Sequence, residues 1–521
     1  MEIYDHLGRL MFDSLKQWPD GICQIDASTG EKETNSSVLS RSVQLANCFR
    51  RFGLQPGDVL SLSGKNHLDI HIPYYAALFN GLPIAGVDPT FKYDEIKTLL
   101  KLTEAKIAFC QPELYEDYAA AASDLGLELR IVTFGEGDHS LKNFIQEFDC
   151  QNGREFEPAN IDIEKTFAWL VCTSGTTGRP KLAAFRHDTI VQKIATVLEL
   201  TRHVTSLEYK VSLNLAPVQW ISSYINTILS PITKHTRVQT SAASTPEHVI
   251  DIINKYKPRT VLTSPALLMN ILSLEREKPC DFTCFDSICI TGSKVPADLI
   301  VELRKRSHAD SVVMELHGQT ETMGVVLWPS PAAPLGSCGR LVPSCQVQLV
   351  NADTGEVIHK PYEHAELWCK GLRFTEYYKN PEETAKAISE DGWYRTGDIF
   401  YKDENENFYF VERLKLLIKY RNYHVIPVEL EEVIRTHANV ADVCVTSVYD
   451  ACDGEHPAAC VVRKPGCDVT AAEIKELIAS KLSDSKQLRG GVVFLDELPY
   501  TTTGKVARAR LKSLIQEAHR E

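Results

Sequence analysis

Three short apolar runs in this chain are each followed directly by small and polar residues. The runs cover residues 167–172, 287–290 and 312–316. A run of this length that ends in such a loop is typical of a buried strand in an α/β sheet. Because ligands of open α/β sheets bind beyond the carboxyl ends of the strands, we expect the three loops to meet at one crevice. After the first loop we predict a helix with Ile190, Ile194 and Val197 on one face.

The first loop has the composition that a polyphosphate site requires. Glycines let backbone N–H groups approach phosphate oxygens, hydroxyls add donors, and a lysine adds positive charge. The lysine follows a proline, so the segment differs from the P-loop pattern. A Gly/Thr-rich surface turn is the alternative interpretation. The predicted phosphate-binding residues are Thr173, Ser174, Gly175, Thr176, Thr177, Gly178 and Lys181.

Three further segments carry groups that suit a nucleotide and its metal ion. Glu321 supplies a carboxylate of the kind that Mg²⁺ prefers, and Thr320 supplies a hydroxyl for a phosphate. Asp398 is a candidate acceptor for the two hydroxyls of a ribose. Lys505 follows a polar, Thr-rich stretch. Taken one at a time, these segments also fit a helix start, a tight turn and a solvated tail.

A cluster of basic residues divides the chain. Arg413, Lys415, Lys419 and Arg421 fall close together, and a compact unit of about a hundred residues is expected after them. We predict there a helix from about Val428, strands over Asp442–Val448 and Ala458–Arg463, a helix from about Ala471, and a strand over Gly491–Leu495. We predict an α/β fold. It has a large N-terminal α/β domain of layered sheets and helices, residues 1–413, and a small mobile C-terminal α+β domain, residues 414–521.

Composition narrows the classes of function. The 521 residues carry a net charge of −13, which argues against a protein built to bind nucleic acid. The 15 cysteines form no C-x-x-C pair, and we expect them to be reduced core residues. We predict no membrane span. The sequence shows neither a signal peptide nor a Ser-Lys-Leu type peroxisomal address, so we expect a cytoplasmic location.

In their order and spacing, these segments resemble the adenylate-forming superfamily, which includes acyl-CoA synthetases, 4-coumarate-CoA ligase and firefly luciferase. The resemblance runs from about Leu60 to Arg510. It implies that the carboxylate of an acid attacks the α-phosphorus of ATP, with Mg²⁺ bound and pyrophosphate leaving. It further implies that the small domain rotates and that coenzyme A takes the acyl group. On this resemblance we predict an AMP-forming acid–thiol ligase, an acyl-CoA synthetase.

The resemblance also implies a role for each segment. Lys505 is implied to bridge the acid carboxylate and the α-phosphate, and Lys415 to act as the hinge. The implied ATP and AMP contacts are the phosphate loop together with Gly292, Ser293, His317, Gly318, Thr320, Asp398, Arg413 and Lys505. The implied catalytic residues are Lys505, Lys181, Thr320 and Glu321, of which Glu321 binds the metal ion. Coenzyme A is implied to enter beside Lys419, Asn422 and His424.

The acid pocket is expected behind the adenine site. Its implied lining is Trp220, Ile221, Gly324 and Val325, with a core role for the tryptophan as the alternative. These residues are apolar or small, and no lysine or arginine stands beside them in the sequence. We therefore expect a hydrophobic monocarboxylate, either a fatty acid or an aryl acid.

The chain departs from the family pattern at three positions. Leu182 follows the loop lysine where glycine is usual, His317 replaces a tyrosine that stacks on adenine, and Asn422 replaces a glycine after the hinge. A non-catalytic pseudoenzyme or ligand-binding protein of the same fold is therefore an alternative. Luciferase-type oxygenation is a third, less favoured hypothesis, because the histidine of the luciferase pocket is Trp220 in this chain.

Overall fold

The computed structural model describes most of the chain and divides it into two compact units. The described residues are 6–148, 155–173, 181–201, 210–292, 295–330, 332–342, 345–371, 373–420, 423–450, 453–482, 484–500, 505–518 and 520. The first unit comprises Met1–Gln346 and Cys369–Tyr394, and the second comprises Val347–Trp368 and Arg395–Glu521. The second unit also contains strands that precede residue 413. The boundary expected between residues 413 and 414 stays a prediction.

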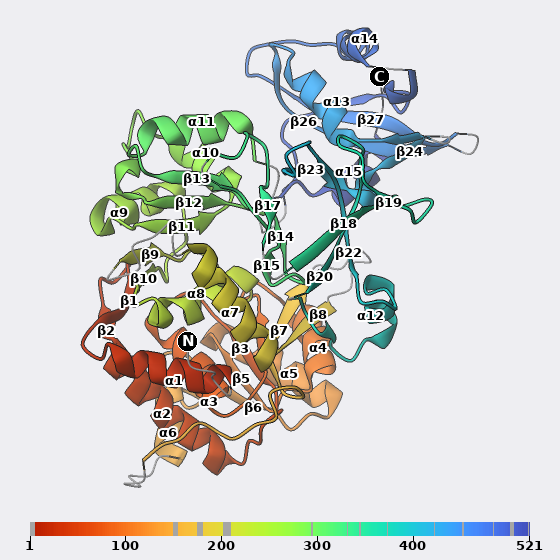
Figure 1. The fold of residues 1–521 in the computed structure, drawn as a ribbon. Coiled ribbons are helices and arrows are strands. Elements are labelled where there is room, and N and C mark those ends of the chain that lie inside the picture. The colour runs from red at the N-terminus through yellow and green to blue at the C-terminus, as the bar shows by residue number, and fades with distance from the viewer. Residues whose placement is uncertain are drawn as a thin grey trace. The chain divides into compact units, whose positions relative to one another are not determined.

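The first unit contains two seven-stranded sheets in which most neighbouring strands run parallel (Figure 1). We call them sheet A and sheet B. Sheet A has the order β13 (Val312–Glu315), β12 (Ser287–Ile290), β11 (Thr260–Thr263), β9 (Val211–Leu213), β10 (Thr236–Gln239), β1 (Ile22–Asp26) and β2 (Lys32–Thr34). Sheet B has the order β21 (Glu376–Tyr377), β8 (Lys181–Arg186), β7 (Phe167–Thr173), β4 (Ile84–Val87), β3 (Leu60–Ser63), β5 (Ile107–Cys110) and β6 (Arg130–Thr133).

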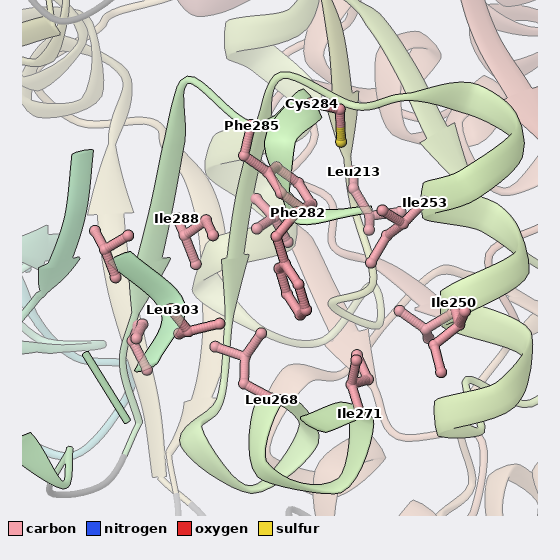
Figure 2. Close-up of a cluster of buried hydrophobic side chains, with 14 of the residues drawn as sticks. Leu213, Ile250, Ile253, Leu268, Ile271, Phe282, Cys284, Phe285, Ile288 and Leu303 are labelled. Carbon is pink, nitrogen blue, oxygen red and sulfur yellow. The ribbon is translucent and has the colours of Figure 1, made fainter. Parts of the chain in front are cut away.

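Helices bury one face of each sheet. Figure 2 shows the core on sheet A, where Leu268, Ile271 and Phe282 pack with Leu303. The helices on sheet A are α9 (Pro246–Tyr256), α10 (Pro265–Ser273) and α11 (Ala297–Arg306). Those on sheet B are α4 (Tyr93–Thr103) and α5 (Tyr115–Leu125). The other helices of this unit are α1 (Leu7–Gln17), α2 (Asn35–Phe52), α3 (His71–Phe79), α6 (Leu141–Phe148), α7 (His187–Thr201), α8 (Ile221–Ile232) and α12 (Pro381–Ala387).

Capping residues explain where several of these helices begin. The side chain of Thr245 accepts a hydrogen bond from the backbone N–H of His248 at the start of α9. Ser264 does the same for Leu267 at the start of α10. In both helices a proline fills the first position, where no backbone N–H is needed.

The second unit contains most of one five-stranded sheet and a second sheet with helices on both faces. The first has the order β19 (Val357–Ile358), β18 (Cys345–Val350), β20 (Ala365–Gly371), β22 (Tyr394–Lys402) and β23 (Phe408–Arg413). The second has the order β25 (Tyr423–Val425), β24 (Ile418–Tyr420), β27 (Gly454–Arg463) and β26 (Val440–Asp450), with β28 (Val492–Leu495) also paired to β27.

Alternation along β26 explains how that second sheet is covered. Val443 and Val445 pack in the cluster that contains α13 (Pro427–Arg435) and α14 (Ala471–Lys481). Cys444, which points to the opposite face, packs with Leu511 and Ile515 of α15 (Arg508–Glu517). A helix pair and a single helix therefore bury the two faces.

Most of the elements expected from the sequence are present, and the α/β fold class is confirmed by the solved structures reported below. The three predicted strand-to-loop segments correspond to β7, β12 and β13. One expectation is wrong, because β8 stands between the first loop and the helix α7. The segment after Lys181 is short and apolar, and it forms a second strand antiparallel to β7 before the helix begins.

Most of the described cysteines are at least partly buried. Of the described cysteines, Cys467 alone is exposed. Burial raises the pKa of the Cys289 thiol to about 12 and that of the Cys460 thiol to about 11. In the part of the chain that the structure describes, no helix has the length and apolar character needed to cross a bilayer.

Candidate active site

The predicted phosphate loop connects two antiparallel strands of sheet B. β7 ends at Thr173, β8 begins at Lys181, and these two residues are paired in the register. Because they are paired, the ends of the loop are held at the spacing of adjacent strands, about 5 Å. The loop residues Ser174, Gly175, Thr176, Thr177 and Gly178 lie outside the described residues.

Leu182, the first departure from the family pattern, packs into the core. Its side chain is 2% exposed and belongs to the cluster that contains Leu99 and Leu100 of α4. Successive residues of a strand point to opposite faces, so Lys181 projects from the other side of β8. The side chain that replaces a glycine therefore occupies core space and does not share a face with the predicted phosphate lysine.

Lys181 is surrounded by an acid and an aromatic ring. Its ammonium forms an ion pair with Glu383 of α12 and lies 5.0 Å from the ring centroid of Tyr377. Hydrogen bonds from Lys181 and then Lys386 lower the pKa of Glu383 to about 2. Glu383 is therefore ionised at neutral pH. Its negative charge offsets the positive charge of the Lys181 ammonium.

The predicted metal ligand lies in the turn of a small hairpin. β14 (Gly318–Gln319) pairs with β15 (Gly324–Val325), and the turn between them contains Thr320 and Glu321. Gly324 closes the turn with a φ of +89°, a conformation that favours glycine. The hydroxyl of Tyr377 donates to Oε1 of Glu321 at 2.8 Å. Burial, with the negative charge of Glu321 beside it, raises the pKa of Tyr377, so the phenol keeps its proton and remains a donor.

Tyr377 thus joins two predicted site residues that are far apart in the sequence. One side of its ring faces the Lys181 ammonium, and its hydroxyl binds Glu321. The antiparallel pairing of β21 with β8, in which Tyr377 opposes Ala183, brings it there. Sequence reasoning missed Tyr377, because nothing local distinguishes it from the neighbouring Tyr378.

The residues predicted around adenine lie at one edge of sheet A. β12 and β13 are parallel, with Ile290 paired to Glu315. Gly292 lies two residues after Ile290, and His317 lies two residues after Glu315. Both residues therefore lie just beyond the carboxyl ends of these parallel strands. Gly292 has a φ of +99°. Ser293 lies outside the described residues.

Glu321 fits the divalent ion that the family implies. In the described part of the chain, no lysine, arginine or histidine lies within 4.0 Å of its carboxylate, which is held in place by the Tyr377 hydroxyl. A half-buried carboxylate without a protein counter-ion suits a hard cation such as Mg²⁺, which usually takes one or two carboxylates and completes its shell with phosphate oxygens and water.

The second unit brings together the predicted ribose residues and the predicted catalytic lysine. Asp398 of β22 opposes Arg413 of β23, and Arg413 Nε lies 2.7 Å from Asp398 Oδ1. Asp398 is fully buried. Lys505 is exposed to solvent. Nearby protein atoms nevertheless desolvate its ammonium and so lower its pKa. Repulsion from Arg413 adds to this effect, and the charge of Asp398 opposes it.

Arg508 anchors the segment that carries Lys505. Its Nη2 lies 2.9 Å from Oε1 of Glu431 on α13, and its Nη1 donates to the carbonyl of Val445 at 2.9 Å. The same Nη2 is 3.9 Å from Glu412, the residue before Arg413. Arg508 therefore connects the strand of the predicted ribose arginine to the start of α15.

The predicted hinge and coenzyme A residues follow in the chain. Lys415 lies in a 3-10 turn (Leu414–Leu416). Lys419 of β24 pairs with His424 of β25, and its backbone N–H donates to Glu455 at 3.0 Å. Asn422 lies outside the described residues.

The structure groups the predicted acid-pocket residues around α8. Trp220 occupies the position before that helix and is 39% exposed, and Ile221 is its first residue. The hairpin approaches the same helix, because a methyl group placed on Gly324 would lie 3.5 Å from Cδ1 of Ile225. Val325 follows directly.

A lysine that sequence reasoning missed also lies against this hairpin. Nζ of Lys193 on α7 donates to the carbonyl of Val325 at 2.8 Å, and the residue is 4% exposed. Burial lowers the pKa of its ammonium. The signal was present in the sequence, since Lys193 stands between Ile190 and Ile194 on the apolar face of the predicted helix. We expected no lysine or arginine near the pocket because none stands beside its residues in the sequence. Lys193 comes close to Val325 through the fold.

Two family models match this chain. The model of the AMP-binding enzyme family matches residues 11–378, and that of the AMP-binding enzyme C-terminal domain matches residues 429–505. The chain is 30% identical over 522 residues to luciferin 4-monooxygenase of Photuris pensylvanica, covering 98% of this chain and 95% of that protein. It is 27% identical over 497 residues to 4-coumarate–CoA ligase-like 9 of Arabidopsis thaliana, covering 94% and 86%.

Solved structures share the fold. ATP-bound MatB from Rhodopseudomonas palustris superposes with a TM-score of 0.87 at 22% identity, covering 98% of this chain and 99% of that one. The luciferase-like enzyme from the nonluminescent mealworm Zophobas morio gives a TM-score of 0.71 at 26% identity, covering 78% and 95%. Since the first family model spans well over half of the residues, the chain belongs to the family of AMP-binding enzymes.

Proposed function

We propose that this protein is an ATP-dependent acid–thiol ligase. It converts a hydrophobic carboxylic acid to its acyl-adenylate with release of pyrophosphate, and then transfers the acyl group to coenzyme A. The observation that carries the proposal is the convergence of Lys181 and Glu321 on Tyr377, which places a cation and a metal-type carboxylate at one locus. The relatives named as coenzyme A ligases and acyl-CoA synthetases support the thiol as acceptor.

In the adenylation half-reaction, the protein positions the reactants and stabilises charge, and it forms no covalent bond with them. Lys181 and Thr320 hold phosphate oxygens, and Asp398 with Arg413 holds the ribose. Glu321 would hold Mg²⁺, which neutralises phosphate charge when bound. Lys505 stabilises the charge that builds up as the carboxylate attacks the α-phosphorus.

The thiol half uses the same acyl-adenylate. The small domain turns at Lys415, and the thiol of coenzyme A attacks the acyl carbon. AMP leaves as the thioester forms. Lys419 supplies positive charge for a phosphorylated thiol substrate.

A pyrophosphate-release assay with MgATP and a panel of fatty and aryl acids, with and without coenzyme A, tests the proposal. Release that is followed by acyl-CoA formation is the expected result. Release without thioester would move the acceptor to another nucleophile. Absence of release with every acid would favour the non-catalytic alternative.

Luciferin-type monooxygenation is a second candidate because of relatives such as the Photuris pensylvanica protein. It shares the adenylation step, so the same residues would serve it. Light emission from a mixture of the protein, MgATP, luciferin and oxygen would favour this candidate. We prefer the ligase because nothing in the described pocket residues selects for oxygen chemistry.

A further inference from the structure

The ammonium of Lys193 is buried without a counter-charge in the part of the chain that the structure describes. The residue is 4% exposed, and among the described residues no carboxylate lies within 4.0 Å of its Nζ. Within the described residues, its one hydrogen bond goes to the carbonyl of Val325, at 2.8 Å. An ammonium has three donors, so this bond leaves two of them for another acceptor. Burying such a group without an anion is costly, and such groups concentrate at functional sites.

The position of Lys193 relates it to the proposed site. Val325, which accepts its hydrogen bond, is paired with Gly318 across the hairpin. Residues paired across antiparallel strands lie about 5 Å apart, so Lys193 approaches one strand while the predicted adenine wall lies on the other. The turn of the same hairpin contains Thr320 and Glu321.

The surroundings of Lys193 combine two buried thiols, Cys345 and Cys369, with apolar side chains. Ile190 and Ile194, its neighbours on the inner face of α7, are buried. Gly324, next to Val325, faces Ile225 of α8. A ligand between α7, α8 and β15 would therefore meet hydrocarbon along its length and one cation.

From this geometry we propose that Lys193 is a specificity residue that binds a second oxygen group of the acid substrate, foremost a carboxylate at the end remote from the reacting carboxyl. This inference rests on the proposed adenylation of a hydrophobic acid and changes its substrate class. The preferred substrate is a hydrophobic acid with a distal oxygen acceptor, and it is not a simple monocarboxylate. Lys193 neither attacks nor transfers a proton. Its ammonium orients the acid.

Acids of equal chain length that differ only at the far end test the proposal. Decanoic, 10-hydroxydecanoic and decanedioic acid would be compared by kcat/KM for pyrophosphate release, in the full-length protein and in Lys193→Met, Lys193→Gln and Lys193→Arg. Gln192→Met is the matched control, because Gln192 is exposed on the same helix.

The wild type is expected to prefer decanedioic acid over decanoic acid by about 10- to 100-fold, the range of a hydrogen bond to a charged group. Lys193→Met and Lys193→Gln should erase this preference while keeping activity with decanoic acid within about threefold. Lys193→Arg and Gln192→Met should preserve the preference. A larger effect for the dicarboxylate than for the hydroxy acid would identify the anion as the preferred partner.

An unchanged ratio in folded Lys193→Met would overturn the inference and leave the proposed ligase intact. Absence of pyrophosphate release by the wild type with every acid would instead overturn the proposed function. In that case the shift of the unfolding midpoint by each acid, compared between wild type and Lys193→Gln, still decides whether Lys193 binds the distal group.

Discussion

The hydroxyl of Tyr377 donates a hydrogen bond of 2.8 Å to Oε1 of Glu321, and this bond fixes the orientation of the predicted metal ligand. Tyr377→Phe removes the hydroxyl and leaves the ring that faces Lys181. We expect adenylation to fall about tenfold and the Mg²⁺ concentration for half-maximal rate to rise, because a residue that orients a metal ligand commonly contributes this much. Magnesium titration of pyrophosphate release measures the effect. Tyr378→Phe is the control, and an equal loss there would contradict the assignment.

Glu383 forms an ion pair with Lys181, the predicted phosphate lysine. We expect Glu383→Ala to free the ammonium and to lower the KM for ATP by about three- to tenfold, which corresponds to roughly 1 kcal/mol. Glu382→Ala is the control, since Glu382 pairs only with the exposed Lys386 among the described cations. A KM for ATP that is unchanged or higher in Glu383→Ala would show that the pair supports the site rather than restraining it.

Lys505 is the predicted catalytic charge. Lys505→Ala is expected to slow pyrophosphate release at least a hundredfold, about 3 kcal/mol, because it removes charge that acts in the transition state. ATP binding, measured by calorimetry, should change little. Lys464→Ala provides an exposed lysine of the same unit as the control. Undiminished release by Lys505→Ala would remove this residue from the mechanism.

The pH profile should reveal the environment of Lys505. Desolvation and Arg413 lower its pKa from 10.5, so as pH rises its positive charge is lost at a lower pH than that of an ordinary lysine. We expect kcat/KM for ATP to fall on an alkaline limb that lies below pH 10.5. In Lys505→Arg this limb should move to higher pH, since guanidinium keeps its proton. A limb that stays in place would assign it to another group.

Arg508 is expected to act by positioning Lys505. Arg508→Ala removes the nearer of two arginines beside Glu431, which is 3% exposed, and leaves Arg435 at 3.9 Å. The loss should cost about 3 kcal/mol of stability. Adenylation should fall about 10- to 100-fold, and Arg508→Lys should recover part of it. Transfer of a supplied acyl-adenylate to coenzyme A should be spared, because the proposed role of Lys505 is confined to the adenylation step. Equal loss of both half-reactions would indicate a structural role alone.

Sequence patterns predicted the strands and helices whose formation depends on neighbouring residues. The apolar runs became β7, β12 and β13, and the segments predicted after the basic cluster became α13, β26, β27, α14 and β28. Burial of a short apolar run beside a loop, and the caps of helices, are properties of neighbouring residues. The strand β8 was missed because an apolar stretch of six residues also fits the start of a helix.

Relations between distant residues could not be read from the same patterns. The opposition of Asp398 and Arg413 depends on the register of β22 and β23, and the contact of Tyr377 with Glu321 depends on the pairing of β21 with β8. Lys193 reaches Val325 across 132 positions of the chain. Register and packing set these contacts, and a single sequence contains no direct trace of them.

The distribution of thiols has a practical consequence. Cys467 is exposed in the second unit, while the buried thiols are held protonated and react slowly with alkylating reagents. With Cys150, Cys452 and the half-buried Cys172, Cys280 and Cys289 replaced by serine, a maleimide dye would attach at Cys467. Energy transfer from that dye to a fluorescent ATP analogue would turn the proposed rotation at Lys415 into an optical signal, so the timing of the two proposed half-reactions could be followed in a single turnover.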